Sequence, residues 1–511
     1  MANAGRVRTA VDGDPGVTEP ISFPARLDQL AAAEPQAPAI VFLPEVGPPS
    51  QLTRSELALG SRRLARLLQA RGVAAGDTVI IALPNGPLHY LASYAVWRLG
   101  ACALPLSTRM TEIEKQQIAD VAAARAVIGD WGHPEGAIIS QAELEHLDRW
   151  PATSLDDVIA HPGKAIASGG STGRPKVIVD PNPWQGTPGG FVEHYRPLGL
   201  RTGQVQLVVG PLYHNAPFLV SHIGLFEEQP LVVLDRFDVG RVLDAIERYR
   251  VNWCYLSPTM MHRVIKAKGV RQRDWSSLEM LYHTSAPCPA WLKEAWIDLL
   301  GAERVVEAYG STEAVGAAVI RGDEWLSHRG SVGRPFHSEV RVIGEDGNDL
   351  PCGQVGLLFF RAAGSGTTYR YLGGDPLPAT DDGFAAVGDL GWVDDEGYVY
   401  LADRRADLII TGGVNVYPAE VEGVLLSHPA VTDAVVIGLP DDEWGKRVHA
   451  TIQLDPAVPP VSAEALDRFI RTQLSAVKVP RTYEFAEIPR NDAGKVRRRA
   501  MVAERTREGP T

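Results

Sequence analysis

The feature that most constrains the fold of this chain is the alternation of helical and strand patterns in its first part. Residues 57–72 have the apolar spacing of a helix, and the basic last turn and Gly72 suit a helix end. A strand, a second helix and another strand follow between residues 77 and 107, and the pattern recurs from Gln206 to Ile265. Helices that alternate with buried apolar strands are typical of a mostly parallel sheet, so we expect an α/β fold.

The pattern changes twice further along the chain. From about residue 330 to 404, short strand patterns separated by turn residues predict a small antiparallel β-barrel or meander attached to the α/β layers. After residue 404 the pattern predicts a compact α+β unit. Since 511 residues exceed the usual size of one core, we expect a large N-terminal domain over residues 1–404, with α/β layers to about 329, and a small C-terminal domain over residues 405–511.

Composition and charge exclude several classes of protein. Hydrophobic residues make up 45% and charged residues 22% of the chain, as in ordinary globular proteins. The net charge is -12, because 62 acidic residues outnumber 50 basic ones, so we expect no nucleic acid partner. No apolar run is long enough to span a bilayer, and the first residues lack the apolar core of a signal peptide. We therefore expect no membrane span and a cytoplasmic location.

The most informative local motif is Ser168-Gly-Gly-Ser-Thr-Gly-Arg-Pro-Lys176, which follows a short apolar run. Glycines let backbone amides turn toward a ligand, and hydroxyls with one lysine add donors that suit phosphate oxygens. The motif is not the common P-loop, because Gly173 is followed by Arg174 and Pro175. Taken alone, it fits a phosphate-binding loop and a flexible surface loop about equally well.

Further motifs follow in a fixed order: Tyr309-Gly-Ser-Thr-Glu313, then Gly388-Asp389-Leu390, Arg404, a Gly412-Gly413 turn, and NDAGK ending at Lys495. In this order they resemble the adenylate-forming superfamily of acyl-CoA synthetases, luciferases and peptide-synthetase adenylation domains. The resemblance runs from near residue 51 to Lys495. Within the superfamily the sequence most resembles the bile-acid-type CoA ligases. It implies the same fold, with a C-terminal domain that rotates about a hinge at Ala406.

The resemblance implies a nucleotide site that binds ATP and then the acyl-adenylate. Tyr309 would stack on the adenine, and Asp389 with Arg404 would hold the ribose hydroxyls. The remaining residues implied for ATP and AMP are Ser168, Gly170, Ser171, Thr172, Gly173, Lys176, Ser285, Ala286, Pro287, Gly310, Ser311 and Thr312.

The resemblance also implies catalytic roles. Lys495 would bridge the acid's carboxylate and the α-phosphate, where a cation lowers the barrier between two anions; the alternative is a surface lysine in a basic tail. Thr312 would contact the adenylate phosphate. Glu313, with Thr172, would hold Mg²⁺, which prefers oxygen ligands. His214 would stand at the mouth of the acyl pocket.

Two further sets of residues concern the thiol and the acid. Gly412 and Gly413 would line the coenzyme A tunnel, and Trp444 with Arg447 would hold its nucleotide end. The acyl pocket would comprise His214, Asn215, Ala216, Phe218, Gly310 and Gly316, which are mostly small or apolar. They suit a bulky hydrophobic acid, and the similarity to bile-acid-type ligases suggests a steroid-like or terpenoid-like one. Adenylation domains for amino acids carry an aspartate for the α-amino group soon after this histidine. No acidic residue lies between His214 and Glu227, which argues against an amino acid as substrate.

Four positions depart from the family pattern: Gly169, Val177, Val387 and Ala406. They bear on phosphate handling and domain rotation, so we expect adenylation to be the weaker half-reaction, with a separate enzyme supplying adenylate as an open alternative. The function we predict is an acyl-CoA ligase that uses ATP, Mg²⁺ and coenzyme A on a small-molecule carboxylic acid. The alternatives are an acyl-AMP ligase that loads a carrier-protein thiol, luciferase-like chemistry with oxygen, and a non-catalytic acyl- or nucleotide-binding protein. Monomer and homodimer both remain open.

Overall fold

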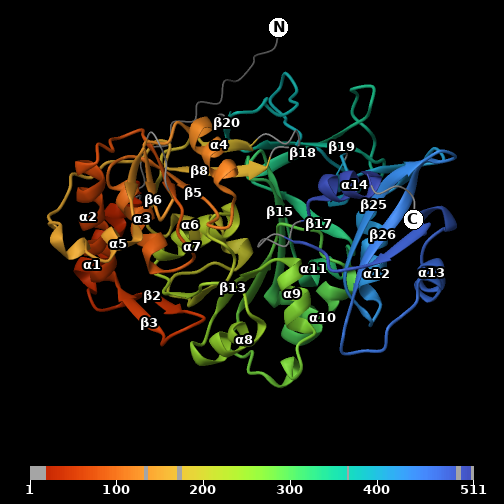
Figure 1. Cartoon of the computed structure of the whole chain (residues 1–511), viewed down its shortest axis with the longest axis horizontal. Coiled ribbons are helices and arrows are strands. Elements are labelled where there is room, and N and C mark those ends of the chain that lie inside the picture. Colours follow the sequence, from red (N-terminus) through yellow and green to blue (C-terminus); the bar gives the residue numbers. More distant parts are fainter. Residues whose placement is uncertain are drawn as a thin grey trace, which may run out of the picture.

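The computed structural model describes residues 19–131, 136–169, 175–364, 368–404, 406–490 and 496–507. Figure 1 shows a large body formed by the first four hundred residues and a C-terminal unit, in blue, at one end of it. The large N-terminal and small C-terminal domains expected from the sequence are confirmed, and the chain is of mixed α/β class.

A seven-stranded sheet is built mostly from strands between residues 78 and 180. Its order is β20-β9-β8-β5-β4-β6-β7. The bounds are β4 Thr78–Ile81, β5 Cys102–Pro105, β6 Ala126–Ile128, β7 Ala137–Ile139, β8 Lys164–Gly169, β9 Pro175–Asp180 and β20 Arg370–Leu372. The strands from β7 to β8 are parallel, whereas β9 pairs antiparallel with both β8 and β20. The parallel α/β layers predicted for this part are therefore confirmed.

A thirteen-stranded sheet forms the centre of the molecule, in the order β18-β19-β21-β22-β17-β16-β15-β14-β13-β11-β12-β2-β3. Its parallel part comprises β2 (Pro38–Leu43), β12 (Leu231–Leu234), β11 (Gln206–Val208), β13 (Trp253–Leu256), β14 (Met280–His283) and β15 (Val305–Gly310). Strand β3 (Ser50–Thr53) closes one edge in the antiparallel sense.

Helices fill the space around these sheets. Helices α2 (Arg54–Ala70), α3 (Pro87–Trp97) and α7 (Asn215–Phe226) share one apolar core with strands of both sheets. Helices α8 (Val239–Arg248), α9 (Pro258–Ile265) and α10 (Ala290–Leu300) pack on the other face of the larger sheet. The further elements of the N-terminal body are β1 (Ile21–Ser22), α1 (Phe23–Ala33), α4 (Glu112–Ala122), α5 (Gln141–Leu144), β10 (Gln185–Gly186), α6 (Gly190–His194) and α11 (Gly322–Trp325).

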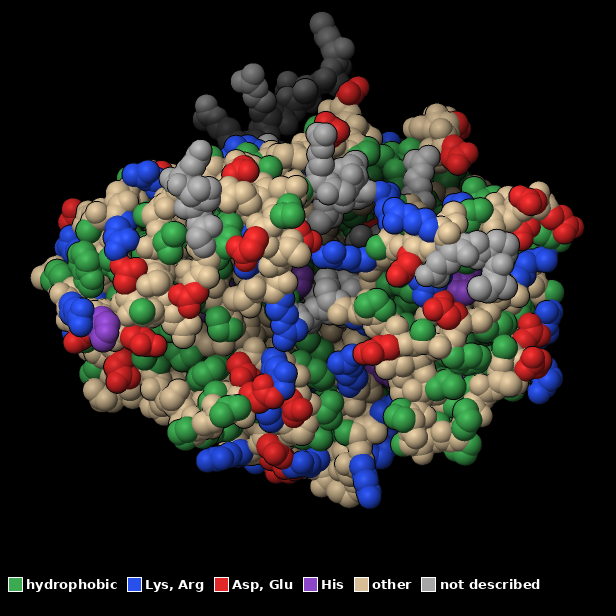
Figure 2. Space-filling view, in the orientation of Figure 1, with side chains coloured by type: hydrophobic (Ala, Val, Ile, Leu, Met, Phe, Trp, Pro, Cys, Tyr) green, Lys and Arg blue, Asp and Glu red, His purple; other side chains and the backbone are tan. Residues whose placement is uncertain are grey.

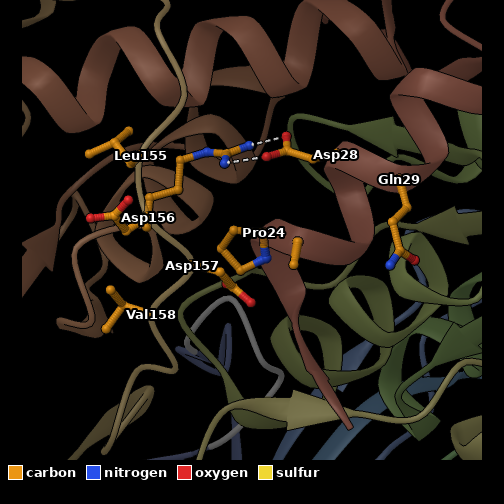
Figure 3. A pocket seen from close by; sticks show the side chains of 9 residues that line it. Pro24, Asp28, Gln29, Leu155, Asp156, Asp157 and Val158 are labelled. Atoms are coloured by element: carbon orange, nitrogen blue, oxygen red, sulfur yellow. Dashed lines mark hydrogen bonds and ion pairs between the residues drawn. The ribbon is translucent and has the colours of Figure 1, made fainter. Parts of the chain in front are cut away.

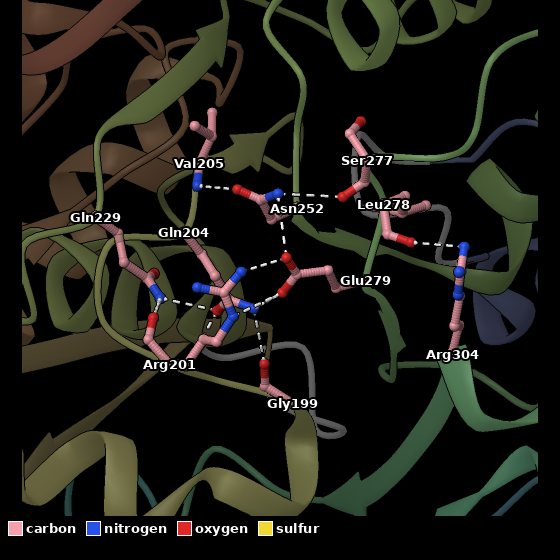
Figure 4. Close-up of polar contacts among 10 residues, drawn as sticks. All are labelled: Gly199, Arg201, Gln204, Val205, Gln229, Asn252, Ser277, Leu278, Glu279 and Arg304. Carbon is pink, nitrogen blue, oxygen red and sulfur yellow. Dashed lines mark hydrogen bonds and ion pairs between the residues drawn. The ribbon is translucent and has the colours of Figure 1, made fainter.

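The amino ends of the parallel strands are tied together by a polar network (Figure 4). The carboxylate of Glu279, just before β14, accepts hydrogen bonds from Arg201, Gln204 and Asn252. The Asn252 side chain also accepts from the Val205 backbone just before β11, at 2.8 Å. These contacts fix the strand register at the amino ends of the parallel strands. The opposite edge, where the strands end, is the usual place for a ligand in such sheets.

The antiparallel strands expected between residues 330 and 404 are present. They are β17 (Ser331–Phe336), β18 (Ser338–Ile343), β19 (Gly356–Ala362), β21 (Asp389–Val393) and β22 (Val399–Arg404), and they follow the antiparallel strand β16 (Ala317–Arg321). Strand β17 pairs with β16, and β16 pairs with β15, so these strands extend the central sheet. Within the described ranges they do not close into a barrel, which leaves the meander as the correct alternative.

The C-terminal unit has a core of its own. A three-stranded sheet of β25 (Val431–Asp441), β26 (Gly445–Leu454) and β27 (Thr482–Phe485) packs with α12 (Pro418–Ser427) and α13 (Ala463–Arg471), while α14 (Arg498–Arg507) packs against β25. A short hairpin of β23 (Ile409–Thr411) and β24 (Val414–Val416) precedes α12. The α+β unit predicted after residue 404 matches this arrangement. The exact boundary at residues 404 and 405 stays a prediction.

Acidic and basic side chains are interspersed over the face shown in Figure 2. Among the described residues, no helix combines the length and apolar character needed to cross a membrane.

Candidate active site

The two arms of the predicted phosphate loop form an antiparallel hairpin. Strand β8 ends at Gly169 and β9 begins at Pro175, and these two residues are partners in the ladder. The next pair brings Ser168 opposite Lys176. Gly170, Ser171, Thr172 and Gly173, which were predicted to contact phosphates, lie outside the described residues. The hairpin therefore places the loop's flanking donors, Ser168 and Lys176, side by side.

Lys176 meets Glu313 although 137 residues separate them in the chain. The Lys176 ammonium lies 3.4 Å from Glu313 Oε1 and donates a 2.7 Å hydrogen bond to the Tyr371 hydroxyl. The Tyr371 hydroxyl in turn donates to Glu313 Oε1. Burial and this hydrogen bond to the Glu313 carboxylate raise the pKa of Tyr371 well above its usual range. The structure thus brings together a predicted phosphate ligand and the predicted magnesium ligand.

Tyr371 is a residue of this site that the sequence analysis missed. It lies on β20, which pairs with β9 so that Leu372 stands opposite Val177. The Lys176 ammonium lies 4.0 Å from the centroid of the Tyr371 ring as well as bonding its hydroxyl. Only the long-range pairing of β20 with β9 reveals this contact, and the local pattern around Tyr371 carries no signal for it.

Tyr309 and Asp389 also meet, 80 residues apart in the chain. The Tyr309 hydroxyl donates to Asp389 Oδ2 at 2.5 Å. Asp389 is the first residue of β21 and stands opposite Arg404 in the β21–β22 ladder. The backbone pairing therefore places the two predicted ribose ligands next to each other, while the Arg404 side chain lies outside the described part of the chain. Asp389 is buried, with 8% of its surface exposed.

The segment predicted to line the adenine follows β14. Ser285 is exposed and has a positive φ of 82°, which turns the chain sharply after the strand. Its hydroxyl shares a 3.0 Å hydrogen bond with the Tyr255 hydroxyl, which comes from the neighbouring strand β13. Ala286 is half-buried and Pro287 is exposed. The segment therefore presents its backbone at the carboxyl edge of the sheet.

A short turn connects the end of β15 with Glu313. It consists of Gly310, the last residue of β15, followed by Ser311 and Thr312. Gly310 is exposed and Thr312 is half-buried. The Ser311 hydroxyl is buried and has no hydrogen-bond partner among the described residues. This turn joins the two contacts described above, since Tyr309 precedes it and Glu313 follows it.

The predicted acyl-pocket residues divide into two groups. His214 is at the N-cap position of α7 without a side-chain capping hydrogen bond, and His214, Asn215 and Ala216 are half-buried. Phe218 is fully buried, with its ring 4.3 Å from that of His222. Phe218 therefore lies in the core in this structure, and its place on the pocket wall stays a prediction. Near the end of β15, a Cβ on Gly316 would lie 2.6 Å from Phe360, so only glycine fits there without a shift.

In the C-terminal unit the structure brings Gly412 against Trp444. The Gly412 amide donates to the Trp444 carbonyl at 3.0 Å, and a Cβ on Gly412 would lie 2.5 Å from the indole ring. At Gly413 an added Cβ would meet no described residue within 4 Å. Both glycines have positive φ angles, of 55° and 78°. Arg447 donates to the Pro440 carbonyl at 2.8 Å, so it is held by the strand pair that carries Trp444.

The expected hinge residue Ala406 is exposed. Its neighbour Asp407 lies 3.5 Å from the guanidinium of Arg498, which also pairs with Glu422 of α12. The ion pair of Asp407 with Arg498 therefore lies one residue after Ala406, which has no charge of its own. Lys495 and Thr172 lie outside the described residues.

The residues present suit Mg²⁺ in the presence of a polyphosphate. The Glu313 carboxylate is an oxygen ligand of the kind that this hard cation prefers. Among the described residues no group of three or more His, Cys, Asp or Glu side chains gathers as a metal site of its own. Phosphate oxygens of bound ATP would have to complete the coordination.

A cavity of about 350 Å³ lies elsewhere, beside α1 and the 155–158 segment (Figure 3). Pro24, Asp28, Asp156 and Asp157 are among the residues that line it, and none of the predicted site residues does. Its one arginine, Arg98, already pairs with Asp28 through two hydrogen bonds of 2.7 and 2.9 Å. The lining gives no argument for an anionic ligand there.

Comparison with known proteins identifies the family. The model for AMP-binding enzymes matches residues 27–372, and the model for the AMP-binding enzyme C-terminal domain matches residues 420–495. A feruloyl-CoA synthase of Amycolatopsis sp is 32% identical over 465 residues, covering 87% of this chain and 92% of that protein. A fatty acid–acyl-carrier-protein ligase of Streptomyces coeruleorubidus is 28% identical over 496 residues, covering 92% and 94%.

A solved structure agrees with these matches. The o-succinylbenzoate coenzyme A synthetase of Bacillus subtilis, in complex with ATP and magnesium ion, superposes with a TM-score of 0.78 at 26% identity, covering 94% of this chain and 99% of that chain. The chain belongs to the family of AMP-binding, adenylate-forming enzymes. Within it the chain is an ATP-dependent acid–thiol ligase, and the ATP, Mg²⁺ and coenzyme A expected from the sequence agree with these relatives.

Proposed function

We propose that this enzyme activates a bulky hydrophobic carboxylic acid as its acyl-adenylate and transfers the acyl group to coenzyme A. The observation that carries the proposal is that three predicted nucleotide residues and the predicted magnesium ligand meet in two pairs, Lys176 with Glu313 and Tyr309 with Asp389. Each pair joins segments that are far apart in the chain. A shared nucleotide site accounts for both contacts.

The chemistry follows from these residues. A carboxylate oxygen of the acid attacks the α-phosphorus of ATP, and pyrophosphate leaves with the electron pair of the broken P–O bond. Lys176 would donate to phosphate oxygens, and Lys495 would offset the negative charge where carboxylate and phosphate meet. Mg²⁺ held by Glu313 would neutralise phosphate charge. In the second step the thiolate sulfur attacks the acyl carbonyl carbon, and AMP leaves.

Pocket composition supports a hydrophobic acid. Ala216 and Gly310 leave room, because neither residue has a side chain beyond Cβ, whereas Phe360 fills the space beside Gly316. The relatives are described as acting on feruloyl, o-succinylbenzoyl and fatty acyl groups, all of which carry a large apolar part. The steroid-like or terpenoid-like acid suggested by the phosphate loop belongs to the same proposal.

We further propose that adenylation is the slower half-reaction. Val177, where the family has glycine, is fully buried in β9 and is paired on both sides, with Ala167 of β8 and Leu372 of β20. A β-branched residue fixed on both edges makes the exit from the phosphate loop stiff. Against this, the Asp407–Arg498 contact supplies a charge near the hinge that Ala406 lacks.

The test is incubation with an acid library, ATP, Mg²⁺ and either coenzyme A or a phosphopantetheinylated carrier protein, read for pyrophosphate and for thioester. Thioester with coenzyme A supports the proposal. Thioester only with the carrier protein favours the alternative that the relative from Streptomyces coeruleorubidus represents. Neither product from any acid would contradict both.

The proposed order of rates needs a second comparison. Thioester formation from acid plus ATP is measured against thioester formation from the synthetic acyl-adenylate, with coenzyme A in both cases. The proposal expects the second rate to be higher, and a separate supplier of adenylate would then be worth seeking. Pyrophosphate release that is faster than thioester formation from the adenylate would overturn it.

A further inference from the structure

A buried lysine stands beside the predicted acyl pocket, and neither the nucleotide nor the thiol chemistry uses it. Lys164 is the first residue of β8, and 6% of its surface is exposed. Its ammonium donates a 2.7 Å hydrogen bond to Asn215 Oδ1 and lies 3.7 Å from Asp180 Oδ2. Burial lowers the pKa of Lys164, and the Asp180 carboxylate opposes that shift. A buried charge is costly, so its contact with an amide calls for an explanation.

The contact fixes which way the Asn215 amide faces. A lysine ammonium has only donors, so the amide atom that faces it must be the oxygen. The NH₂ group of Asn215 then points away from Lys164. Among the described residues no acceptor lies within hydrogen-bond distance of this nitrogen, and it is not among the sealed polar atoms that lack a partner. Asn215 is half-buried, so its NH₂ group faces open space.

The position of Asn215 directs this donor. It is the first residue of α7, directly after the N-cap residue His214 and before the small residue Ala216. If His214 stands at the mouth of the acyl pocket, the Asn215 NH₂ group is a fixed donor in a wall that is otherwise small and apolar. A few placed polar groups in an apolar pocket are what give such sites their specificity.

We propose that the Asn215 NH₂ group donates a hydrogen bond to an acceptor oxygen in the body of the acyl group, and that Lys164 is the positioning residue that holds the amide in this orientation. The acceptor is a carbonyl, ether or hydroxyl oxygen away from the reacting carboxylate. The enzyme therefore selects oxygen-bearing hydrophobic acids over pure hydrocarbons of the same skeleton. This inference rests on the proposed function, because it places Asn215 in the pocket of an acid-activating enzyme.

A purely structural role for the pair gives a different expectation. Lys164 would then need only an oxygen partner to offset its charge beside Asp180, and the NH₂ group of Asn215 would be idle. The substitution Asn215→Asp separates the two roles, because it keeps the oxygen toward Lys164 at nearly the same size and removes the donor. Asn215→Leu removes both.

The experiment measures kcat/KM for thioester formation with two matched pairs of acids, 4-phenylbutanoate against 4-oxo-4-phenylbutanoate and cinnamate against ferulate. The wild-type enzyme should prefer the more oxygenated member of at least one pair by about tenfold, the worth of one neutral hydrogen bond. Asn215→Asp should lose this preference, read as the ratio of kcat/KM between the two members of each pair, so that a change in rate common to both members does not count. Lys164→Met should lose part of it, because the amide is then free to turn.

The outcomes are separable. A wild-type preference below about twofold in both pairs, or a preference that Asn215→Asp leaves intact, overturns the inference while thioester formation still upholds the proposed function. If no thioester forms from any of these four acids or from any acid of the library, the proposed function is overturned and the inference with it. Should Lys164→Met fail to fold, Asn215→Asp still decides the question.

Discussion

The hydroxyl of Tyr309 donates a 2.5 Å hydrogen bond to Oδ2 of Asp389. Tyr309 is the residue expected against the adenine, and Asp389 is expected to hold the ribose. The bond therefore couples two recognition elements for one nucleoside, one from the end of the parallel strands and one from the antiparallel part of the sheet. A ring held by its hydroxyl keeps fewer rotamers in the free enzyme, so less entropy is lost when ATP binds.

The substitution Tyr309→Phe tests this coupling. It keeps the ring and removes the hydrogen bond to a carboxylate, which is worth roughly 1.5–3 kcal/mol. We expect the KM for ATP to rise about tenfold with little change in kcat, because the loss affects binding of substrate and transition state alike. Steady-state kinetics at saturating acid and coenzyme A give both values.

A matched control exists on the next strand. The Tyr400 hydroxyl donates to Asp394 at 3.0 Å, and neither residue is among the predicted site residues. Tyr400→Phe should lower the free energy of unfolding by a similar amount and leave the KM for ATP unchanged. An equal rise in KM for both variants would mean that Tyr309 acts through stability alone.

The sequence predicted the elements of this fold better than their long-range partners. The helix expected over residues 57–72 is α2, which begins three residues earlier because Thr53 and Glu56 form a capping box before the first apolar residue. The alternating pattern expected to recur from Gln206 does so, and its first strand is β11, Gln206–Val208. Local patterns decide such features, so a single sequence is enough to find them.

The pairing of distant strands is different, because period-2 alternation predicts a strand without its neighbour. The barrel, one of the two arrangements expected over residues 330–404, depended on such pairing, and β17 joins β16 instead. The same limit hid Tyr371. The candidate site followed from motif order, and the contacts within it required the tertiary structure.

The role of Lys495 is tested by Lys495→Ala. Its charge is needed only where carboxylate meets phosphate, so we expect acyl-adenylate formation to fall by on the order of 10²–10³. Thioester formation from supplied adenylate should remain near the wild-type rate. The exposed neighbour Arg499 provides the control, since Arg499→Ala removes a nearby charge and should alter neither step. Equal damage to both half-reactions by Lys495→Ala would contradict the assigned role.

The thiol path is tested by Gly413→Leu. Among the described residues no atom lies within 4 Å of a Cβ added to Gly413, so this part of the structure leaves room for the side chain. If coenzyme A passes there, acyl-adenylate should accumulate without thioester. The positive φ of Gly413 costs about 1 kcal/mol for any other residue. Gly347→Leu is the control, because Gly347 has a φ of 82°, equal space, and a place in the turn between β18 and β19. Thioester made at the normal rate by Gly413→Leu would exclude this path.

The last prediction concerns acid stability and two buried histidines. His89 on α3 and His222 on α7 are almost fully buried, with 1% and 0% of their surfaces exposed. Burial lowers the pKa of each from 6.5 to about 3, and for His89 the proximity of His222 adds to the effect. Between these values the unfolded chain binds a proton at each site and the folded chain does not. The part of the free energy of unfolding that depends on these two histidines is therefore largest above about pH 6.5, and it decreases as the pH falls.

The substitution His89→Gln removes one of these two groups without enlarging the side chain. Each such histidine makes the free energy of unfolding fall by about 1.4 kcal/mol per pH unit below pH 6.5. The variant should therefore lose about 2 kcal/mol less than the wild type between pH 7 and pH 5, measured by urea unfolding at each pH. Packing changes shift both values equally and cancel in the difference. The exposed His146 gives the control, since His146→Gln should keep the wild-type slope. If His89→Gln also keeps that slope, His89 is protonated in the folded protein well above pH 5, and its burial does not hold it neutral.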